Sequence, residues 1–171
     1  IFSDYQNDLE RLASGYERIV RFLAFIGLPL SVLLYFTASE VTLIIFGDQW
    51  IPSIPIFQIL TLSVGIQIIL SSSGSIFQAA GDTKSLFVCG LFSSALNVTG
   101  ILLGIFWIGT LEAVASCITL TFTVNFIQCY WIMYQVTLHR SLRNFVAQLI
   151  SPFVISILLT AVLYPLSLLT E

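Results

Sequence analysis

Residues 85–111 read SLFVCGLFSSALNVTGILLGIFWIGTL, an apolar run that lies between Lys84 and Glu112 and contains no charged residue. A helix needs about 20 apolar residues to cross a hydrocarbon core of roughly 30 Å. Backbone groups inside hydrocarbon must bond to one another, so we expect this run to be helical. Transmembrane strands would be about 10 residues long with strict alternation, which the run lacks. The run therefore predicts a membrane-spanning helix.

Four further apolar runs divide the rest of the chain, at residues 22–39, 49–81, 113–138 and 144–170. The first reaches spanning length when Ile19 and Val20 are included. We therefore expect an all-α polytopic membrane helix bundle with about five transmembrane helices. Their expected positions are near 19–38, 54–80, 85–108, 112–137 and 144–169. Residues 1–18 have helical spacing of apolar side chains, which predicts an amphipathic segment along the cytoplasmic membrane surface.

The overall composition excludes a soluble fold and a disordered chain. Of the 171 residues, 57% are hydrophobic and only 9% are charged, and the mean hydropathy is +1.00. An average soluble chain has roughly 25% charged residues, and a disordered chain is poor in apolar ones. Because the sequence begins at Ile1 rather than Met, we interpret it as a piece of a longer protein.

The basic residues all fall on one side of a five-crossing arrangement. They lie in the amino-terminal segment and in the second and fourth connections, and they are Arg11, Arg18, Arg21, Lys84, Arg140 and Arg143. The other connections carry only Glu40, Asp48 and Glu112. Since Lys and Arg are enriched on the cytoplasmic side of membrane proteins, we predict that the amino-terminal segment is cytoplasmic.

Polar residues recur at helical spacing inside the apolar runs. One interpretation is that they are packing seams, where small residues let helices approach and amides bond between them. The other is that at least one stripe lines a hydrophilic passage, because an unpaired amide in hydrocarbon is costly. The candidates for lining such a passage are Gln67, Asn97, Asn125 and Gln128.

The sequence contains no pattern that indicates catalysis, a cofactor or a metal. It has no GxxxxGK[ST] phosphate loop, no paired carboxylates and no Ser/His/Asp set. Its cysteines, Cys89, Cys117 and Cys129, lack CxxC spacing, and we interpret them as small helix- or lipid-facing residues. No basic patch indicates a nucleic-acid partner. Pro29 and Pro152 fall inside expected helices and should kink them. Such kinks occur in the moving helices of transporters, and a static kink is the alternative.

Several short motifs carry a resemblance to a known family. The first expected helix has an internal proline, Pro29, and is followed by FGDQW at 46–50. Next come PSIPIFQILTL at 52–62 and QAAGDTK at 78–84. This order resembles the carboxyl-terminal half of Wzx-type polysaccharide flippases, which belong to the multidrug/oligosaccharidyl-lipid/polysaccharide exporter superfamily. Glu112 departs from the pattern, since similar proteins have a glycine there.

The resemblance implies part of a two-lobed transporter in the bacterial inner membrane. Similar proteins move undecaprenyl-diphosphate-linked oligosaccharide from the cytoplasmic to the periplasmic leaflet, for polysaccharides that include lipopolysaccharide. It also implies the lipid bilayer and other membrane proteins of polysaccharide assembly as partners. Arg18 and Arg21 are candidates to meet the diphosphate at the cytoplasmic mouth, with positive-inside anchoring as the alternative.

Three other functions stay open. A drug/cation antiporter of the same superfamily would need an intramembrane carboxylate. A polymerase or ligase of polysaccharide assembly would present a large external loop with Arg or His, whereas the expected external loops here are short and acidic. A membrane subunit that transports nothing is the third.

Overall fold

A computed structural model describes the backbone of residues 2–170 and the side chains of residues 9–165 and 167. Its elements in chain order are α1 (Phe2–Phe36), α2 (Ala38–Phe46), η1 (Asp48–Ser53), α3 (Ile54–Leu70), α4 (Ser73–Ala79), α5 (Thr83–Leu103), η2 (Gly104–Ile108), α6 (Leu111–Ile132), η3 (Met133–Thr137) and α7 (Leu142–Thr170). Here η1 is a 3-10 helix, and η2 and η3 are π-helical turns. No strand occurs among residues 2–170, so the predicted all-α class is confirmed.

Five helical segments are long and apolar enough to cross a membrane. They are Leu9–Phe36, Asp48–Ala79, Thr83–Ile108, Leu111–Thr137 and Leu142–Pro165. The lengths run from 24 to 32 residues, which exceeds the roughly 20 that a bilayer requires. The prediction of five transmembrane helices is therefore confirmed, and the chain is a multi-pass membrane protein.

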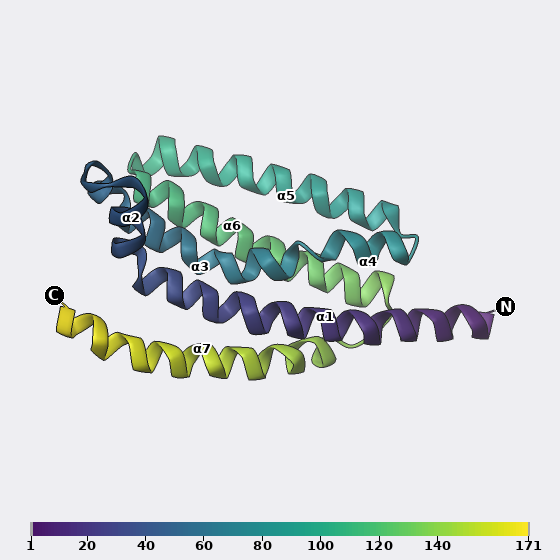
Figure 1. Ribbon diagram of the computed structural model, residues 1–171. Helices are drawn as coiled ribbons and strands as arrows, with labels where there is room; N and C mark the ends of the chain where they lie inside the picture. The colour runs from purple at the N-terminus through teal and green to yellow at the C-terminus, as the bar shows by residue number, and fades with distance from the viewer. Residues whose placement is uncertain (1, 171) are drawn as a thin grey trace.

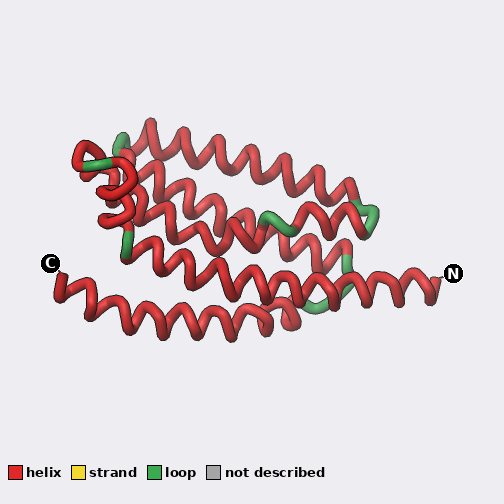
Figure 2. The backbone as a smooth tube through the Cα atoms, viewed as in Figure 1, coloured by secondary structure: helices red, strands yellow, loops and turns green. Residues whose placement is uncertain are grey.

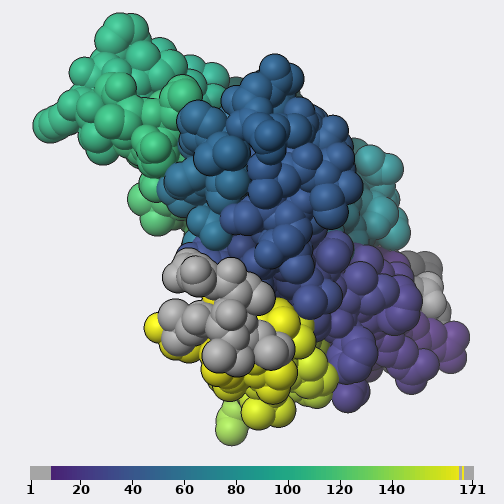
Figure 3. Space-filling model, turned by 60° about the vertical axis from the view of Figure 1, so that its left-hand side comes forward, coloured from purple at the N-terminus to yellow at the C-terminus, as the bar shows by residue number. Residues whose placement is uncertain are grey.

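Near α2 the five segments lie side by side in an open layer, in the order α5, α6, α3, α1, α7 (Figure 1). Toward the other end α6 crosses the second segment and reaches α7, where Tyr130 stacks on Phe145. Each helix packs against its neighbours in this row: α5 on α6, α6 on α3, α3 on α1 and α1 on α7. Most connecting loops lie toward the two ends of the layer, and one turn, between α3 and α4, lies within it (Figure 2). In Figure 3 the green α5–α6 hairpin and the yellow α7 lie at opposite extremes, with α2 and η1 between them. Both broad faces carry large apolar side chains, which hydrocarbon or further helices can cover.

Lys84, Arg140 and Arg143 lie at or beside the connections at one end of this layer, and α1 extends to the same end with its own basic residues, Arg11, Arg18 and Arg21; we call this part the basic end (Figure 1). It comprises α1 as far as Arg21, the α4–α5 turn, the loop between η3 and α7, and the first turn of α7. Gly81 and Gly109 make the tight turns at opposite ends, with φ of +73° and +74°, a region that glycine enters without a Cβ clash. Thr110 caps α6 beside Glu112, which is exposed in the first turn as a solvated helix start.

The first helix differs from the expected arrangement, because α1 has no boundary at residue 18. Residues 2–36 form one helix of 35 residues, about 50 Å long at 1.5 Å per residue. A helix of that length exceeds a hydrocarbon core of roughly 30 Å. The amphipathic turns are therefore an extension of the first spanning helix, and in Figure 1 they project beyond the other helices.

The second spanning segment also differs, since the helix expected near 54–80 is interrupted at Ser71 and Ser72. The hydroxyl of Ser71 donates to the carbonyl of Ile68 at 2.7 Å, and that of Ser72 to Ile69 at 2.8 Å. Serine hydroxyls that bond to their own helix carbonyls compete with the backbone ladder and bend helices. The interruption follows from this run of serines, which apolar periodicity does not detect.

Close contact between α1 and α3 depends on two glycines, Gly27 and Gly65. A Cβ on Gly65 would lie 3.0 Å from the carbonyl oxygen of Gly27 and 2.9 Å from Leu28 Cδ2. A similar contact joins α5 and α6, where a Cβ on Gly100 would lie 2.5 Å from Thr121 Cγ2. Small residues allow backbones to approach closely in membranes, where lipid tails provide no hydrophobic drive between helices.

Candidate functional site

A groove between α1 and α7 contains both arginines predicted to contact phosphate. Its volume is about 520 Å³, and its lining residues are Ser14, Glu17, Arg18, Arg21, Phe22, Phe25 and Gln148. We call it the arginine groove. Arg18 and Arg21 are exposed, and the structure shows no hydrogen bond or ion pair from either to another side chain of residues 9–165.

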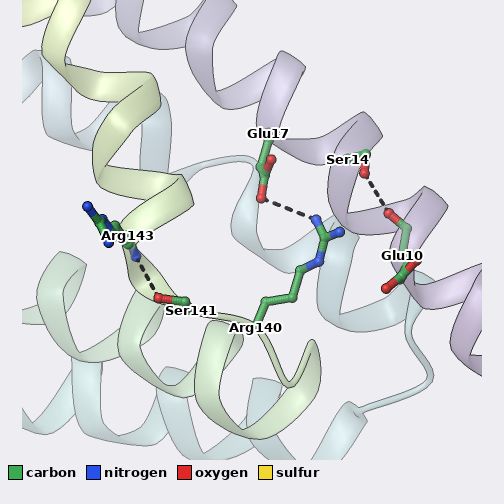
Figure 4. A network of polar contacts seen from close by, with 6 residues as sticks. All are labelled: Glu10, Ser14, Glu17, Arg140, Ser141 and Arg143. Carbon is green, nitrogen blue, oxygen red and sulfur yellow. Dashed lines mark hydrogen bonds and ion pairs between the residues drawn. The ribbon is translucent and has the colours of Figure 1, made fainter.

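The acidic residue of the groove, Glu17, is paired with a different cation. Arg140, in the loop before α7, lies with its Nη1 3.5 Å from Glu17 Oε1 (Figure 4). Glu17 is 13% exposed and Arg140 is 25% exposed, so the pair is largely shielded from water. The contact joins α1 to the α7 loop and pairs the acidic residue that lines the groove. The groove therefore retains the positive charge of Arg18 and Arg21.

A second cavity continues the groove toward the tip of α1. Its volume is about 550 Å³, and it is lined by Glu10, Arg11, Ser14, Gly15, Arg18 and Arg140. The hydroxyl of Ser14 donates to the carbonyl oxygen of Glu10 at 2.7 Å, within α1. Arg18 lines both cavities, so a bound anion at Arg18 could be approached from the end of α1 that projects from the layer.

Gln67 and Asn97, two of the four amides expected to line a passage, bond to helix neighbours. Gln67 Nε2 donates to the hydroxyl of Ser63 on α3 at 2.8 Å. Asn97 Nδ2 donates to the carbonyl of Ser93 at 2.9 Å, and Asn97 Oδ1 accepts from Thr121 Oγ1 at 2.9 Å. The bond to Thr121 crosses from α5 to α6 and is the kind of contact that a packing seam requires.

Asn125 and Gln128, both on α6, have unsatisfied oxygens. Asn125 is 6% exposed, and its Oδ1 and the Oε1 of Gln128 are buried without a partner among the described residues. An unpaired carbonyl in an apolar environment is costly, so each position favours contact with a donor. No hydrogen bond joins any two of the four candidate amides within residues 9–165.

A buried cluster of aromatic hydroxyls at the basic end was not predicted. Tyr16 of α1 and Tyr130 of α6 have their hydroxyls 2.8 Å apart, and the hydroxyl of Tyr16 is 3.0 Å from that of Ser72. The ring of Tyr130 stacks on Phe145 of α7, with centroids 4.2 Å apart. This tyrosine cluster joins α1, the α3–α4 interruption, α6 and α7. Sequence spacing could not predict it, because its members are apolar-face residues of separate helices.

Asp82 at the α4–α5 turn connects that turn to η3. Its Oδ1 accepts from the backbone N–H of Ser85 at 3.0 Å, which caps α5, and its Oδ2 accepts from Thr137 Oγ1 at 2.7 Å. The hydrogen bond from Thr137, followed by that from Ser85, lowers the pKa of Asp82 below its ordinary value of 3.8. Asp82 is therefore a charged structural contact between two parts of the basic end.

The described residues contain no cluster of three His, Cys, Asp or Glu side chains suited to a metal. The cysteines Cys89, Cys117 and Cys129 are free thiols, the first and last of them buried. The chemistry that the described side chains offer is hydrogen bonding and cationic attraction.

Comparison with known proteins relates the chain to polysaccharide biosynthesis. The family model described as "Polysaccharide biosynthesis protein" matches residues 1–55. Teichuronic acid biosynthesis protein TuaB of Bacillus subtilis (strain 168) is 25% identical, over 98% of this chain and 34% of its own length. Lipopolysaccharide biosynthesis protein WzxC of Escherichia coli (strain K12) is 24% identical over the same shares. An uncharacterized membrane protein in the cps region of Klebsiella pneumoniae is 18% identical over 89% of this chain.

No solved structure is significantly similar to the chain. The chain spans about one third of the length of the curated relatives it matches. The similarity to them extends over 98% of the chain and therefore includes all five membrane-spanning segments. The resemblance to Wzx-type polysaccharide biosynthesis proteins is thus confirmed along nearly the whole chain.

Proposed function

We propose that the protein to which this chain belongs transports lipid-linked oligosaccharide, undecaprenyl-diphosphate repeat units, from the cytoplasmic to the periplasmic leaflet of a bacterial inner membrane. The observation that carries the proposal is similarity over 98% of the chain to proteins of teichuronic acid and lipopolysaccharide biosynthesis. The two products differ in chemistry, so their shared feature is the handling of a polysaccharide precursor at a membrane. The proposed role is transport, and no catalytic step is assigned to this chain.

The basic end is the cytoplasmic end in this proposal. All Lys and Arg residues of the chain lie there, and the opposite turns carry acidic residues only. The positive-inside tendency supports this orientation. It puts the amino-terminal turns of α1 and the arginine groove at the leaflet where lipid-linked repeat units are proposed to begin their transfer.

The open layer suits one wall of a transport cavity. A hydrated sugar and diphosphate cannot cross hydrocarbon without a polar path, because desolvation of such groups is prohibitive. Transporters supply that path between repeats or lobes that rock against each other. Asn125 and Gln128, with buried unsatisfied oxygens, are the strongest candidates to face the path. Gln67 and Asn97 remain weaker candidates because they have partners.

Deletion of the gene in its native host tests the proposed function. The lipid-linked repeat units of the two membrane leaflets are then compared by treating intact and broken cells with a membrane-impermeant glycosidase. Accumulation of single repeat units in the cytoplasmic leaflet supports a flippase. Unchanged export with lost drug resistance would favour the antiporter instead, and single units that accumulate in the periplasmic leaflet would favour a polymerase or ligase.

A further inference from the structure

We propose that the arginine groove binds the diphosphate of a polyprenyl-linked lipid, with the lipid chain lying against Phe22 and Phe25. The proposal names the lipid class that contacts one site of this chain, and it rests on the proposed function for the identity of the carrier lipid. The charge, the apolar surface and the position of the groove along α1 each support it.

The charge of the groove matches a diphosphate. Arg18 and Arg21 lie three residues apart on α1, which brings their Cβ atoms to about 5–6 Å. Both line the same groove, and Glu17, its only acidic residue, is paired with Arg140. Guanidinium groups form bidentate, charge-assisted hydrogen bonds with phosphate oxygens. Two adjacent guanidiniums allow each phosphate of a diphosphate to contact one guanidinium. A phosphodiester lipid carries a single negative charge and would use only one of them.

The apolar part of the groove matches a lipid chain. Phe22 is 65% exposed and Phe25 is 53% exposed, and both line the groove beside the arginines. They follow Arg18 and Arg21 in α1, on the side of the membrane interior. Gln148 of α7 adds an amide to the lining, which can bond to a phosphate or sugar oxygen. The groove therefore has a cationic outer part and an aromatic inner part, as an amphiphile requires.

The position of the groove along α1 fits the start of the first spanning segment. Arg21 is the last charged residue of α1, and the following residues to Phe36 contain no charge. Along a spanning helix, charged residues give way to apolar residues near the membrane boundary. A diphosphate at Arg18 and Arg21 would therefore lie at the start of the first expected span, near 19–38, while its chain would extend into hydrocarbon along Phe22 and Phe25.

Binding is tested on the full-length protein in nanodiscs of phosphatidylcholine. Undecaprenyl diphosphate is titrated, and the bound fraction is measured by native mass spectrometry. Undecaprenol and phosphatidylglycerol are the comparison lipids. The test variant combines Arg18→Gln with Arg21→Gln, and the matched control is Arg143→Gln. Arg143 is an exposed arginine of the same end that does not line the groove and lies apart from the Glu17–Arg140 pair (Figure 4).

The expected result is at least about a tenfold weaker affinity for undecaprenyl diphosphate in the double Gln variant, from the loss of charge-assisted contacts. Arg143→Gln leaves affinity unchanged, and a double Lys variant at positions 18 and 21 lies between, since it retains charge without the bidentate geometry. Because both arginines are exposed, the fold should tolerate these changes. Alanine at Phe22 and Phe25 should weaken binding of undecaprenol and undecaprenyl diphosphate alike.

Three results would overturn the inference: equal affinity in the double Gln variant, an equal loss in Arg143→Gln, or displacement of the diphosphate lipid by an equal concentration of phosphatidylglycerol. The last would identify the groove as a site for ordinary anionic phospholipid. Failure here leaves the deletion phenotype unchanged, so it is distinct from failure of the proposed function. Binding through the groove together with normal leaflet distribution in the deletion strain would overturn only the transport proposal.

Discussion

The hydroxyl of Tyr130 on α6 donates to the carbonyl oxygen of Ile69 on α3, 3.0 Å away and buried. In an uninterrupted helix that carbonyl would accept from the N–H of Ser73, four residues later. At the interruption the same carbonyl accepts from the backbone N–H of Ser72 at 3.3 Å and from the Ser72 hydroxyl at 2.8 Å, and Tyr130 of the neighbouring helix is a further donor. The interruption in the second spanning segment is thus a point of contact with α6.

Tyr130→Phe should destabilise the protein by about 1–2 kcal/mol, because it removes a buried hydroxyl that bonds to the Ile69 carbonyl and to the Tyr16 hydroxyl. The ring stack on Phe145 is retained, since phenylalanine keeps the aromatic ring. The free energy of unfolding in detergent measures the effect. Tyr164→Phe is the control, because Tyr164 is 59% exposed and should show no change. Equal stability of Tyr130→Phe would mean that the Ile69 carbonyl needs no donor from α6.

Gly65→Ala should destabilise the protein by about 1–3 kcal/mol through overpacking. The new Cβ would lie 3.0 Å from the carbonyl oxygen of Gly27, so α1 and α3 would have to separate. Gly74→Ala is the matched control, because no atom lies within 4 Å of its Cβ position. The control should be neutral or slightly stabilising, as alanine is the better helix former. Thermal unfolding in detergent compares the two, and equal melting temperatures would contradict the close approach.

Asp82 should make stability sensitive to acid. The pKa of Asp82 is lower in the folded state than its ordinary value of 3.8, chiefly through the hydrogen bond from Thr137. Its contribution is therefore fully present above the unfolded pKa and is lost as the pH falls through the folded pKa. The melting temperature of the unaltered protein should drop more steeply below about pH 4 than that of Asp82→Asn.

The Asp82→Asn variant keeps an N-cap for α5, since asparagine caps as well as aspartate. Asp82→Ala removes the cap as well and should cost about 1 kcal/mol at neutral pH. The two variants separate the role of charge from that of capping. Parallel melting curves for the unaltered protein and Asp82→Asn down to pH 3 would show that the Thr137 contact does not depend on the carboxylate charge.

The sequence predicts the spanning segments well and the contacts between them poorly. Uncharged runs, such as residues 85–111, must be helical in hydrocarbon whatever surrounds them, so their number and position follow from composition. The tight turns at Gly81 and Gly109 follow from glycine at loop positions. The contacts between helices cannot be predicted in this way, because the spacing of apolar residues in α1 and α6 does not indicate that Tyr16 contacts Tyr130. The order of helices in the layer also depends on such contacts between helices, so the periodicity of apolar residues does not predict it.

In the candidate site, too, individual residues could be predicted from the sequence, whereas the contacts between them could not. Arg18 and Arg21 were candidates for phosphate contact through the resemblance to Wzx-type flippases, with positive-inside anchoring as the alternative. The groove that they line also includes Gln148 of α7, and the packing of α7 on α1 does not follow from the sequence pattern. The pairing of Glu17 with Arg140 joins residues 123 positions apart. Equally, a passage-lining role for Asn97 could not be weighed without Thr121, whose hydroxyl occupies the Asn97 carbonyl.

Asn97 and Thr121 should show a measurable coupling between α5 and α6. Their side chains bond at 2.9 Å, and interhelical hydrogen bonds of this type average about 0.6 kcal/mol in membranes. A double-mutant cycle with Asn97→Ala and Thr121→Ala measures the coupling as the departure from additivity in unfolding free energy. Additive losses would mean that the two residues act separately, and would return Asn97 to the set that can line a passage.

Thiol labelling in whole cells should place both turns of the basic end in one compartment. In a protein freed of its natural cysteines, single cysteines at Lys84 and His139 should react only after the inner membrane is made permeable, because positive ends face the cytoplasm. Single cysteines at Asp48 and Glu112 should react with an impermeant maleimide once the reagent reaches the periplasm. These four positions sample two turns at each end of the layer. A five-segment chain must alternate sides, so reactivity of positions 84 and 139 in opposite compartments would remove one crossing and with it the layer itself.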